Sequence, residues 1–186
     1  MVVMPTIAAE FHMNNIVQNW AIIIILLVVA VLSVPAGQIS GKYGLKKVTI
    51  ISVVLFILIS IANVLVTSSE QFLLCRLILG ISLSFFNVTS MAMVVSAFRP
   101  EERGKALGIT ITGVYIALSL APVLGGILNY HLGWRSVVLF GVPFLLVILA
   151  LLFTKVDEEW ITFGGISLDV KGSVAYGIGM VLFIYG

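Results

Sequence analysis

The sequence has little charge and a single cysteine. Only 10% of its 186 residues are charged while 61% are hydrophobic, and the mean hydropathy is +1.22. A soluble domain has about 25% charged residues, so this composition excludes one and predicts an all-α integral membrane protein. The lone Cys75 excludes an intrachain disulfide and a cysteine-based metal cluster, and we expect it to pack as a small apolar residue.

Acidic residues and histidines are absent from the apolar runs. All eight acids lie in loops or at the ends of the runs, and His12 and His131 lie in predicted outer loops. A membrane-embedded enzyme needs such groups clustered at bilayer depth, so we expect no enzyme activity, no metal site and no cofactor. The net charge of +2 comes from loops and not from a basic face, so nucleic acid is not an expected partner. The N-terminus has no basic n-region, so we expect no secretory signal.

The sequence does contain long apolar runs. A helix needs about 20 residues to cross the hydrocarbon core of a bilayer, and five runs are long enough. They are Ile16–Ile39, Val48–Thr67, Phe72–Phe98, Ala106–Tyr130 and Val137–Phe153. We predict that residues 1–153 form a transmembrane bundle, with a remnant of a span over residues 1–10, that 154–171 form a cytoplasmic linker, and that 172–186 begin a further, truncated span.

Basic residues alternate between the connections. Eight of the ten Lys and Arg residues lie after the first run, after the third run or in the linker, whereas Arg76 lies inside a run and Arg135 in another connection. Membrane proteins retain Lys and Arg on the cytoplasmic side. We therefore predict a multi-pass protein of the cell membrane whose basic connections are cytoplasmic.

The first basic connection carries a specific pattern. Residues 37–47 read Gly-Gln-Ile-Ser-Gly-Lys-Tyr-Gly-Leu-Lys-Lys, which resembles the G-x-L-x-D-R-x-G-R-K-x signature between the second and third spans of the major facilitator superfamily. The resemblance implies a cytoplasmic gate loop made of Gly37, Gly41, Lys42, Gly44, Lys46 and Lys47. Gly41 stands where the family has an Asp that takes part in a latch between a charge and a helix dipole. The lysines also fit a solvated cluster of the kind that any cytoplasmic loop carries.

Arg76 is the one ionisable residue well inside an apolar run. It lies six residues beyond Glu70, about 9 Å into the membrane, where its side chain could reach outward or face a cavity. Helical spacing places small and polar residues on the same face, which predicts the lining of a substrate or proton cavity. That face holds Arg76, Gly80, Ser84, Asn87 and Met91. The segment from Arg76 to Gly80 is similar to the R-x-x-Q-G element of the family's fourth span, whose Arg is implicated in proton coupling.

The run from Gly108 to Gly126 has a small residue at every fourth position. Gly113, Ala117, Ala121 and Gly125 predict a smooth ridge against which another helix packs closely. The run also resembles the G-x8-G-x3-G-P-x2-G-G antiporter motif of the EmrB/QacA-type fourteen-span drug:proton antiporters. The matches are Gly108, Pro122, Gly125 and Gly126, with Ala117 and Ala121 in place of glycines. Plain helix packing explains the ridge equally well, but it leaves the proline and the paired glycines unexplained.

Two further observations agree with this resemblance. Trp134-Arg135 is similar to the W-R entrance to the family's sixth span, although Trp134 also suits an aromatic belt and Arg135 a headgroup contact in any membrane protein. The pattern G-x-[IL]-x4-G-x-[KR] begins at Gly37 and recurs at Gly126. Inverted three-span repeats predict such a recurrence on opposite sides of the membrane.

The resemblance implies the N-terminal six-helix bundle of a major facilitator transporter, with a truncated first span and the start of a seventh. We therefore expect a secondary active transporter that exports small amphipathic compounds in exchange for protons by alternating access. Its expected partners are the small-molecule substrate, protons, the lipid bilayer and a C-terminal half outside this chain. A transporter of another substrate class and an inactive or structural membrane fragment stay open as alternatives.

Overall fold

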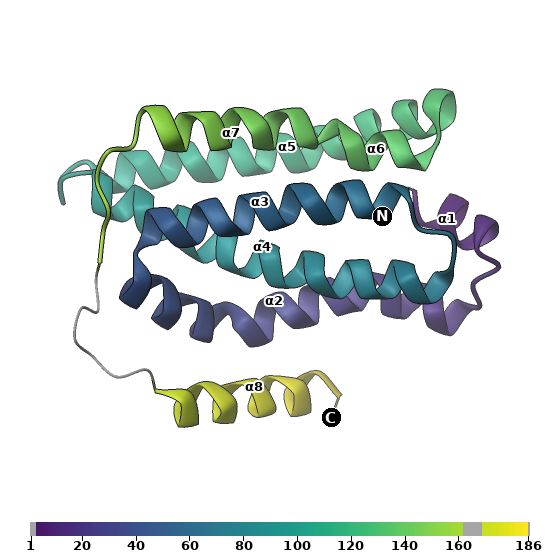
Figure 1. The fold of residues 1–186 in the computed structure, drawn as a ribbon, viewed down its shortest axis with the longest axis horizontal. Coiled ribbons are helices and arrows are strands. Elements are labelled where there is room, and N and C mark those ends of the chain that lie inside the picture. The colour runs from purple at the N-terminus through teal and green to yellow at the C-terminus, as the bar shows by residue number, and fades with distance from the viewer. Residues whose placement is uncertain (1–2, 162–168, 186) are drawn as a thin grey trace.

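The computed structural model describes residues 3–161 and 169–185, and all the regular structure in them is helical. The long helices lie side by side along the same axis, and α1 lies at one end of the bundle (Figure 1). Their bounds are α1 Met4–Glu10, α2 Asn15–Tyr43, α3 Leu45–Val64, α4 Ser69–Ala97, α5 Arg103–Leu132, α6 Trp134–Phe140, α7 Val142–Thr154 and α8 Val170–Tyr185. Within the described residues, five helical segments, with α6 and α7 taken together, are long and apolar enough to cross a membrane.

Helix ends follow local sequence signals. The side chain of Asn14 accepts a hydrogen bond from the Val17 amide at the start of α2, and Ser68 does the same for Gln71 at the start of α4. Such caps satisfy amide groups that have no partner within the helix. Gly44 and Gly133 each form a one-residue turn between two helices, and both have positive φ, +106° and +79°. Glycine adopts this conformation without steric cost.

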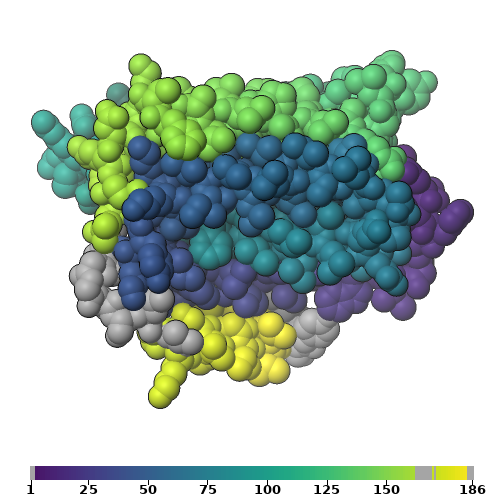
Figure 2. Space-filling model, in the orientation of Figure 1, coloured from purple at the N-terminus to yellow at the C-terminus, as the bar shows by residue number. Residues whose placement is uncertain are grey.

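The helices pack around α3 and α4, which contact most of the others. Helix α4 lies between α2 and α3, while α6 and α7 pack against α3 and α5 packs against α6 (Figure 1). Helix α8 lies along the outer side of α2 (Figures 1 and 2). The ends of α2, α4 and α7 and the start of α8 lie at one end of the bundle, so the eight basic residues of the connections and linker gather there.

The predicted spans are confirmed, but the first basic connection and the last apolar run differ from the prediction. Residues 40–47 do not form a loop, because α2 continues to Tyr43 and α3 begins at Leu45. The glycine at 44 turns the chain in one residue, so the polar residues around it remain helical. The fifth run is divided at Gly141 into α6 and α7, since Pro143 has no amide hydrogen to donate to the preceding turn.

Candidate transport site

The predicted polar face of α4 packs against α2. Gly80 is buried so closely that a Cβ built on it would lie 3.0 Å from Cβ of Val28 and 3.3 Å from Cα of Ile25. Ser84 is also fully buried, and its hydroxyl has no hydrogen-bond partner within the described residues. Small side chains at these positions let the two backbones approach each other. This part of the face therefore holds the bundle together.

Arg76 lies on the same face, nearer the α1 end of the bundle. Its side chain lines a cavity of about 170 Å³ between α1, α2 and α4. The guanidinium lies 4.7 Å above the ring of Phe72, and its buried Nε has no hydrogen-bond partner among the described residues. A guanidinium keeps its charge in proteins, and an unpaired buried charge is costly. The Phe72 ring therefore faces the charge, while Nε is left without an acceptor from these residues.

The other two predicted cavity residues lie apart from Arg76. Asn87 is exposed and Met91 is 41% exposed, both toward the opposite end of α4. A second cavity, of about 390 Å³, lies near this end and is lined from α2, α3 and α4 by residues that include Gly37, Gly41 and Val88. The described residues do not gather the five predicted side chains around one cavity, and their role in transport stays a prediction.

The predicted gate loop is a tight helical turn. Gly37 packs on Val88 of α4, with 3.7 Å from a built Cβ to Cγ1, and Gly41 is buried in the last turn of α2. Lys42 lies in that same last turn, while Lys46 and Lys47 lie in the first turn of α3. The glycines thus face the bundle, and the lysines flank the turn. Their function as a gate is a prediction.

Helix α5 has an almost entirely uncovered surface. From Gly108 to Leu124, every residue except Thr110 is exposed. Of the predicted ridge, only Gly125 is buried, with 3.9 Å from a built Cβ to Val137. Nothing lies within 4 Å of a Cβ built at Gly113, and Ala117, Ala121 and Pro122 are exposed. Among the described residues the ridge therefore meets another helix only at Gly125, because α5 stands beside α6 at the edge of the bundle, and close packing along the rest of the ridge stays a prediction. Gly126 is half-buried next to the covered end.

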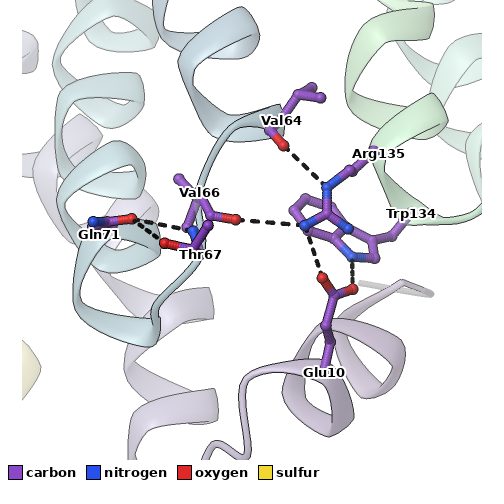
Figure 3. Close-up of polar contacts among 7 residues, drawn as sticks. All are labelled: Glu10, Val64, Val66, Thr67, Gln71, Trp134 and Arg135. Carbon is purple, nitrogen blue, oxygen red and sulfur yellow. Dashed lines mark hydrogen bonds and ion pairs between the residues drawn. The ribbon is translucent and has the colours of Figure 1, made fainter.

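Glu10 joins α1 to the start of α6 (Figure 3). Its carboxylate accepts a hydrogen bond from Nε1 of Trp134 at 2.6 Å and forms an ion pair with Arg135 at 2.7 Å. Arg135 also donates from Nε to the carbonyl of Val64 at 3.0 Å. The Arg135 hydrogen bond, followed by that from Trp134, holds the pKa of Glu10 below its ordinary value. Three separate segments are thereby fixed at one end of the bundle.

Trp134 completes an aromatic cluster at this end. It is only 2% exposed, and its ring lies 6.0 Å from Phe11 and 6.1 Å from Phe72. The aromatic-belt interpretation of Trp134 is therefore wrong, because the ring is buried within the protein. Arg135 has partners within the protein but is still 38% exposed, and its contact with a headgroup stays a prediction. Sequence reasoning missed Glu10. Its position at the end of an apolar remnant gave no sign of a partner more than a hundred residues away.

The apolar helices and the glycine turns at Gly44 and Gly133, at opposite ends of the bundle, are those of a helical multi-pass membrane protein. Comparison with known proteins gives its family. The family model described as Major Facilitator Superfamily matches residues 1–164. The drug efflux pump JefA of Mycobacterium tuberculosis is 30% identical over 159 residues, which is 85% of this chain and 31% of JefA. The chain belongs to the major facilitator superfamily, as its motifs predicted.

Two further relatives show the range of the comparison. The multidrug resistance protein Stp of M. tuberculosis is 31% identical over 159 residues, 85% of this chain and 30% of Stp. The riboflavin transporter RibZ of Clostridioides difficile is 30% identical over 139 residues, 75% of this chain and 30% of RibZ. The chain thus spans about three-tenths of the length of the relatives it matches.

Proposed function

We propose that these residues are the N-terminal bundle of a proton-coupled transporter of the EmrB/QacA type that exports small amphipathic compounds. The observation that carries the proposal is Arg76, a partly buried cation that lines a cavity between spans and whose buried Nε has no hydrogen-bond partner among the described residues. Intramembrane charges mark transport pathways and proton relays. The printed names of JefA and Stp, a drug efflux pump and a multidrug resistance protein, support export of drug-like compounds.

Proton coupling requires a carboxylate that Arg76 can influence. The acids of the described residues lie at helix ends or in connections, so none lies within a span. We propose that a carboxylate from another part of the transporter carries the proton. The guanidinium would favour the ionised form of such a group and so help it release its proton. Asn87 and Met91 would line the pathway closer to the gate, with Met91 as an adaptable apolar wall.

The uncovered surface of α5 supports a second bundle as partner. Its Thr and Ser hydroxyl groups donate to carbonyls within the helix, as in the 2.8 Å bond from Thr112 to the carbonyl of Gly108. The remaining surface is apolar and smooth, which suits close approach of another transmembrane helix. In alternating access one bundle rocks against the other. We propose that the Gly113–Ala117–Ala121 ridge is the surface on which this rocking takes place.

The basic end of the bundle is the cytoplasmic end in this proposal. Eight of ten Lys and Arg residues gather there, as the positive-inside rule predicts for cytoplasmic connections. The turn at Gly44 is then a cytoplasmic gate, and the Glu10–Arg135 cluster lies on the external side. The protein has no enzymatic activity in this account.

A second candidate is a carrier of one defined nutrient-like compound. The identity to RibZ, a riboflavin transporter, is as high as the identity to JefA. The two candidates share fold and mechanism and differ in the range of substrates. A panel of lipophilic cations, acids and vitamins separates them, because a drug exporter handles several members and a dedicated carrier handles one.

The proposal is tested by expressing the longest reading frame that contains this chain in a drug-sensitive bacterium and measuring retention of a fluorescent cation. We expect export by the unaltered protein and its loss in Pro122→Leu and Gly125→Leu, with membrane insertion intact. The 186-residue chain alone is expected to export nothing. Unchanged export by both variants would show that the α5 motif serves only helix packing. Absence of export by the unaltered protein, while JefA exports in a parallel assay, would contradict the proposal.

A further inference from the structure

The linker that follows α7 is attached to the start of α3. The amide of Leu45 donates to the carbonyl of Trp160 at 3.0 Å. Oε1 of Glu159 accepts hydrogen bonds from the amide of Lys46 at 2.8 Å and from that of Lys47 at 3.4 Å. Figure 1 shows the chain after α7 passing beside the start of α3, and the two surfaces meet in Figure 2.

These contacts form a helix cap whose acceptor, Glu159, lies more than a hundred residues away in the sequence. The first amides of a helix lack partners within it, and an N-cap side chain normally accepts from the second and third helical amides. The N-cap of α3 is Gly44, which has no side chain, and residues 37–47 contain no acid. Glu159 takes that role for Lys46 and Lys47. Its negative charge also suits the positive end of the helix dipole.

The turn is shaped to receive this carboxylate. Gly44 has φ +106°, and a Cβ built on it would overlap Oε1 of Glu159 and lie 2.6 Å from Cδ. Glycine is therefore favoured here by the backbone conformation, and a larger residue would also displace the Glu159 carboxylate from the turn. At the other positive-φ glycine of the described residues, Gly133, a built Cβ meets nothing within 4 Å.

A matching arrangement exists at the opposite end of the bundle. The turn at Gly133 is followed by Trp134 and Arg135, which are held by Glu10 from the first half of the chain. The turn at Gly44 lies in the first half and is held by Glu159 from beyond α7. At each turn, a glutamate from a distant part of the chain thus contacts the residues that closely follow the glycine, through their side chains at Gly133 and through a backbone amide at Gly44.

We propose that Glu159 is a positioning residue that fastens the first part of the linker, residues 155–161, to the gate turn. The linker leads to α8, which packs against α2. The role of this turn as a gate rests on the proposed function, whereas the fastening itself rests only on the contacts.

Amide hydrogen exchange of the 186-residue chain in lipid nanodiscs tests the fastening directly. The amides of Leu45 and Lys46 should exchange slowly in the unaltered chain. Glu159→Ala should speed exchange at Lys46 by about tenfold, the equivalent of one lost hydrogen bond. Glu159→Gln keeps an acceptor oxygen and should give a smaller increase. Glu158→Ala removes an exposed neighbouring carboxylate and should change nothing.

A second pair of variants tests the same contact from the turn. Gly44→Ala and Gly133→Ala both force an L side chain into positive φ, but only the first displaces a carboxylate. Gly44→Ala should therefore speed exchange at Lys46, and Gly133→Ala should not. Exchange at Lys46 that is unchanged in both Glu159→Ala and Gly44→Ala, with helix content intact by circular dichroism, would overturn the proposal.

A transport measurement separates this inference from the proposed function. In the transporting protein, Glu159→Ala should lower the maximum rate per inserted molecule by several-fold and leave KM unchanged, because Glu159 lies outside the substrate pathway. Partial recovery in Glu159→Gln is expected. Absence of transport by the unaltered protein, together with slow exchange at Lys46, would contradict the proposed function and leave the fastening in place. Equal maximum rates for Glu159→Ala and Glu158→Ala would overturn the positioning role.

Discussion

Oε1 of Glu10 lies 2.7 Å from Nη2 of Arg135, so an ion pair joins the end of α1 to the start of α6. Both side chains are 38% exposed, and isolated pairs of this kind contribute little because solvent screens them. This pair is part of a network, since Glu10 also accepts from Trp134 and Arg135 also donates to Val64. Networks with fixed geometry contribute more than their separate pairs. We therefore expect its removal to be measurable.

The network makes stability depend on pH in one direction. The pKa of Glu10 is held below its ordinary value of 4.5, first by Arg135 and then by Trp134. The folded chain therefore binds this proton less readily than the unfolded chain does. The resulting stabilisation is fully present above about pH 4.5 and is lost as the pH falls through the folded pKa. In detergent unfolding, the unfolding free energy of the unaltered chain should exceed that of Glu10→Gln by a constant amount near pH 7, and the difference should shrink as the pH falls below about 4.5 and through the folded pKa. A gap that stays constant over that range would contradict the assigned contacts.

Two glycines on different helices should respond oppositely to the same substitution. Gly80→Ala places a methyl group 3.0 Å from Val28 and 3.3 Å from the backbone of Ile25, and overpacking of this kind costs about 1–3 kcal/mol. Gly113→Ala meets no neighbour and should stabilise the chain, because alanine in a helix interior is favoured over glycine by about 0.5–1 kcal/mol. Unfolding of both variants in mixed micelles measures the difference. Equal destabilisation would show that Gly113 is also packed against another helix.

Removing the charge of Arg76 should stabilise the 186-residue chain and abolish transport. The buried Nε has no partner among the described residues, and an unsatisfied buried group costs about 1–3 kcal/mol, or more when charged. Arg76→Leu should therefore raise the unfolding free energy of the chain while eliminating export by the transporting protein. A chain that becomes less stable on this substitution would show that the contact with the Phe72 ring outweighs the cost of the unpaired Nε.

The proposed orientation predicts which ends of the bundle can be labelled from outside the cell. In a Cys75→Ser background, Glu101→Cys lies at the basic end and Leu132→Cys lies at the other end, and both positions are exposed. A membrane-impermeant maleimide added to intact cells should label only the cysteine at 132. Permeabilised cells, in which both should react, provide the control. The reverse pattern would invert the topology.

The sequence predicted the spans because long apolar runs dominate helix placement in a membrane. It misplaced the ends of several helices, because polar residues such as Ser40 and Lys42 continue a helix when a single glycine can reverse the chain. The recurrence of the Gly37 pattern at Gly126 correctly anticipated two similar turns, at Gly44 and Gly133.

The side-chain partners were harder to predict. Helical spacing placed Gly80 and Arg76 on one face, but it did not show that α2 would cover that face. Trp134 is buried because Phe11 and Phe72 converge on it from distant parts of the chain. Glu159 caps α3 because the linker returns to the end of the bundle from which the turn at Gly44 projects. Such contacts depend on tertiary arrangement, and no local pattern in the sequence reports them.

Proton movement driven by substrate is the most direct test of the central claim. The longest reading frame that contains this chain would be reconstituted in proteoliposomes with a pH-sensitive dye inside and a substrate gradient as the only driving force. The account predicts proton flux opposite in direction to substrate flux, abolished by Arg76→Leu, and absent from liposomes that hold the 186-residue chain alone. Substrate flux with no accompanying proton flux, or proton exchange by the 186-residue chain alone, would contradict it.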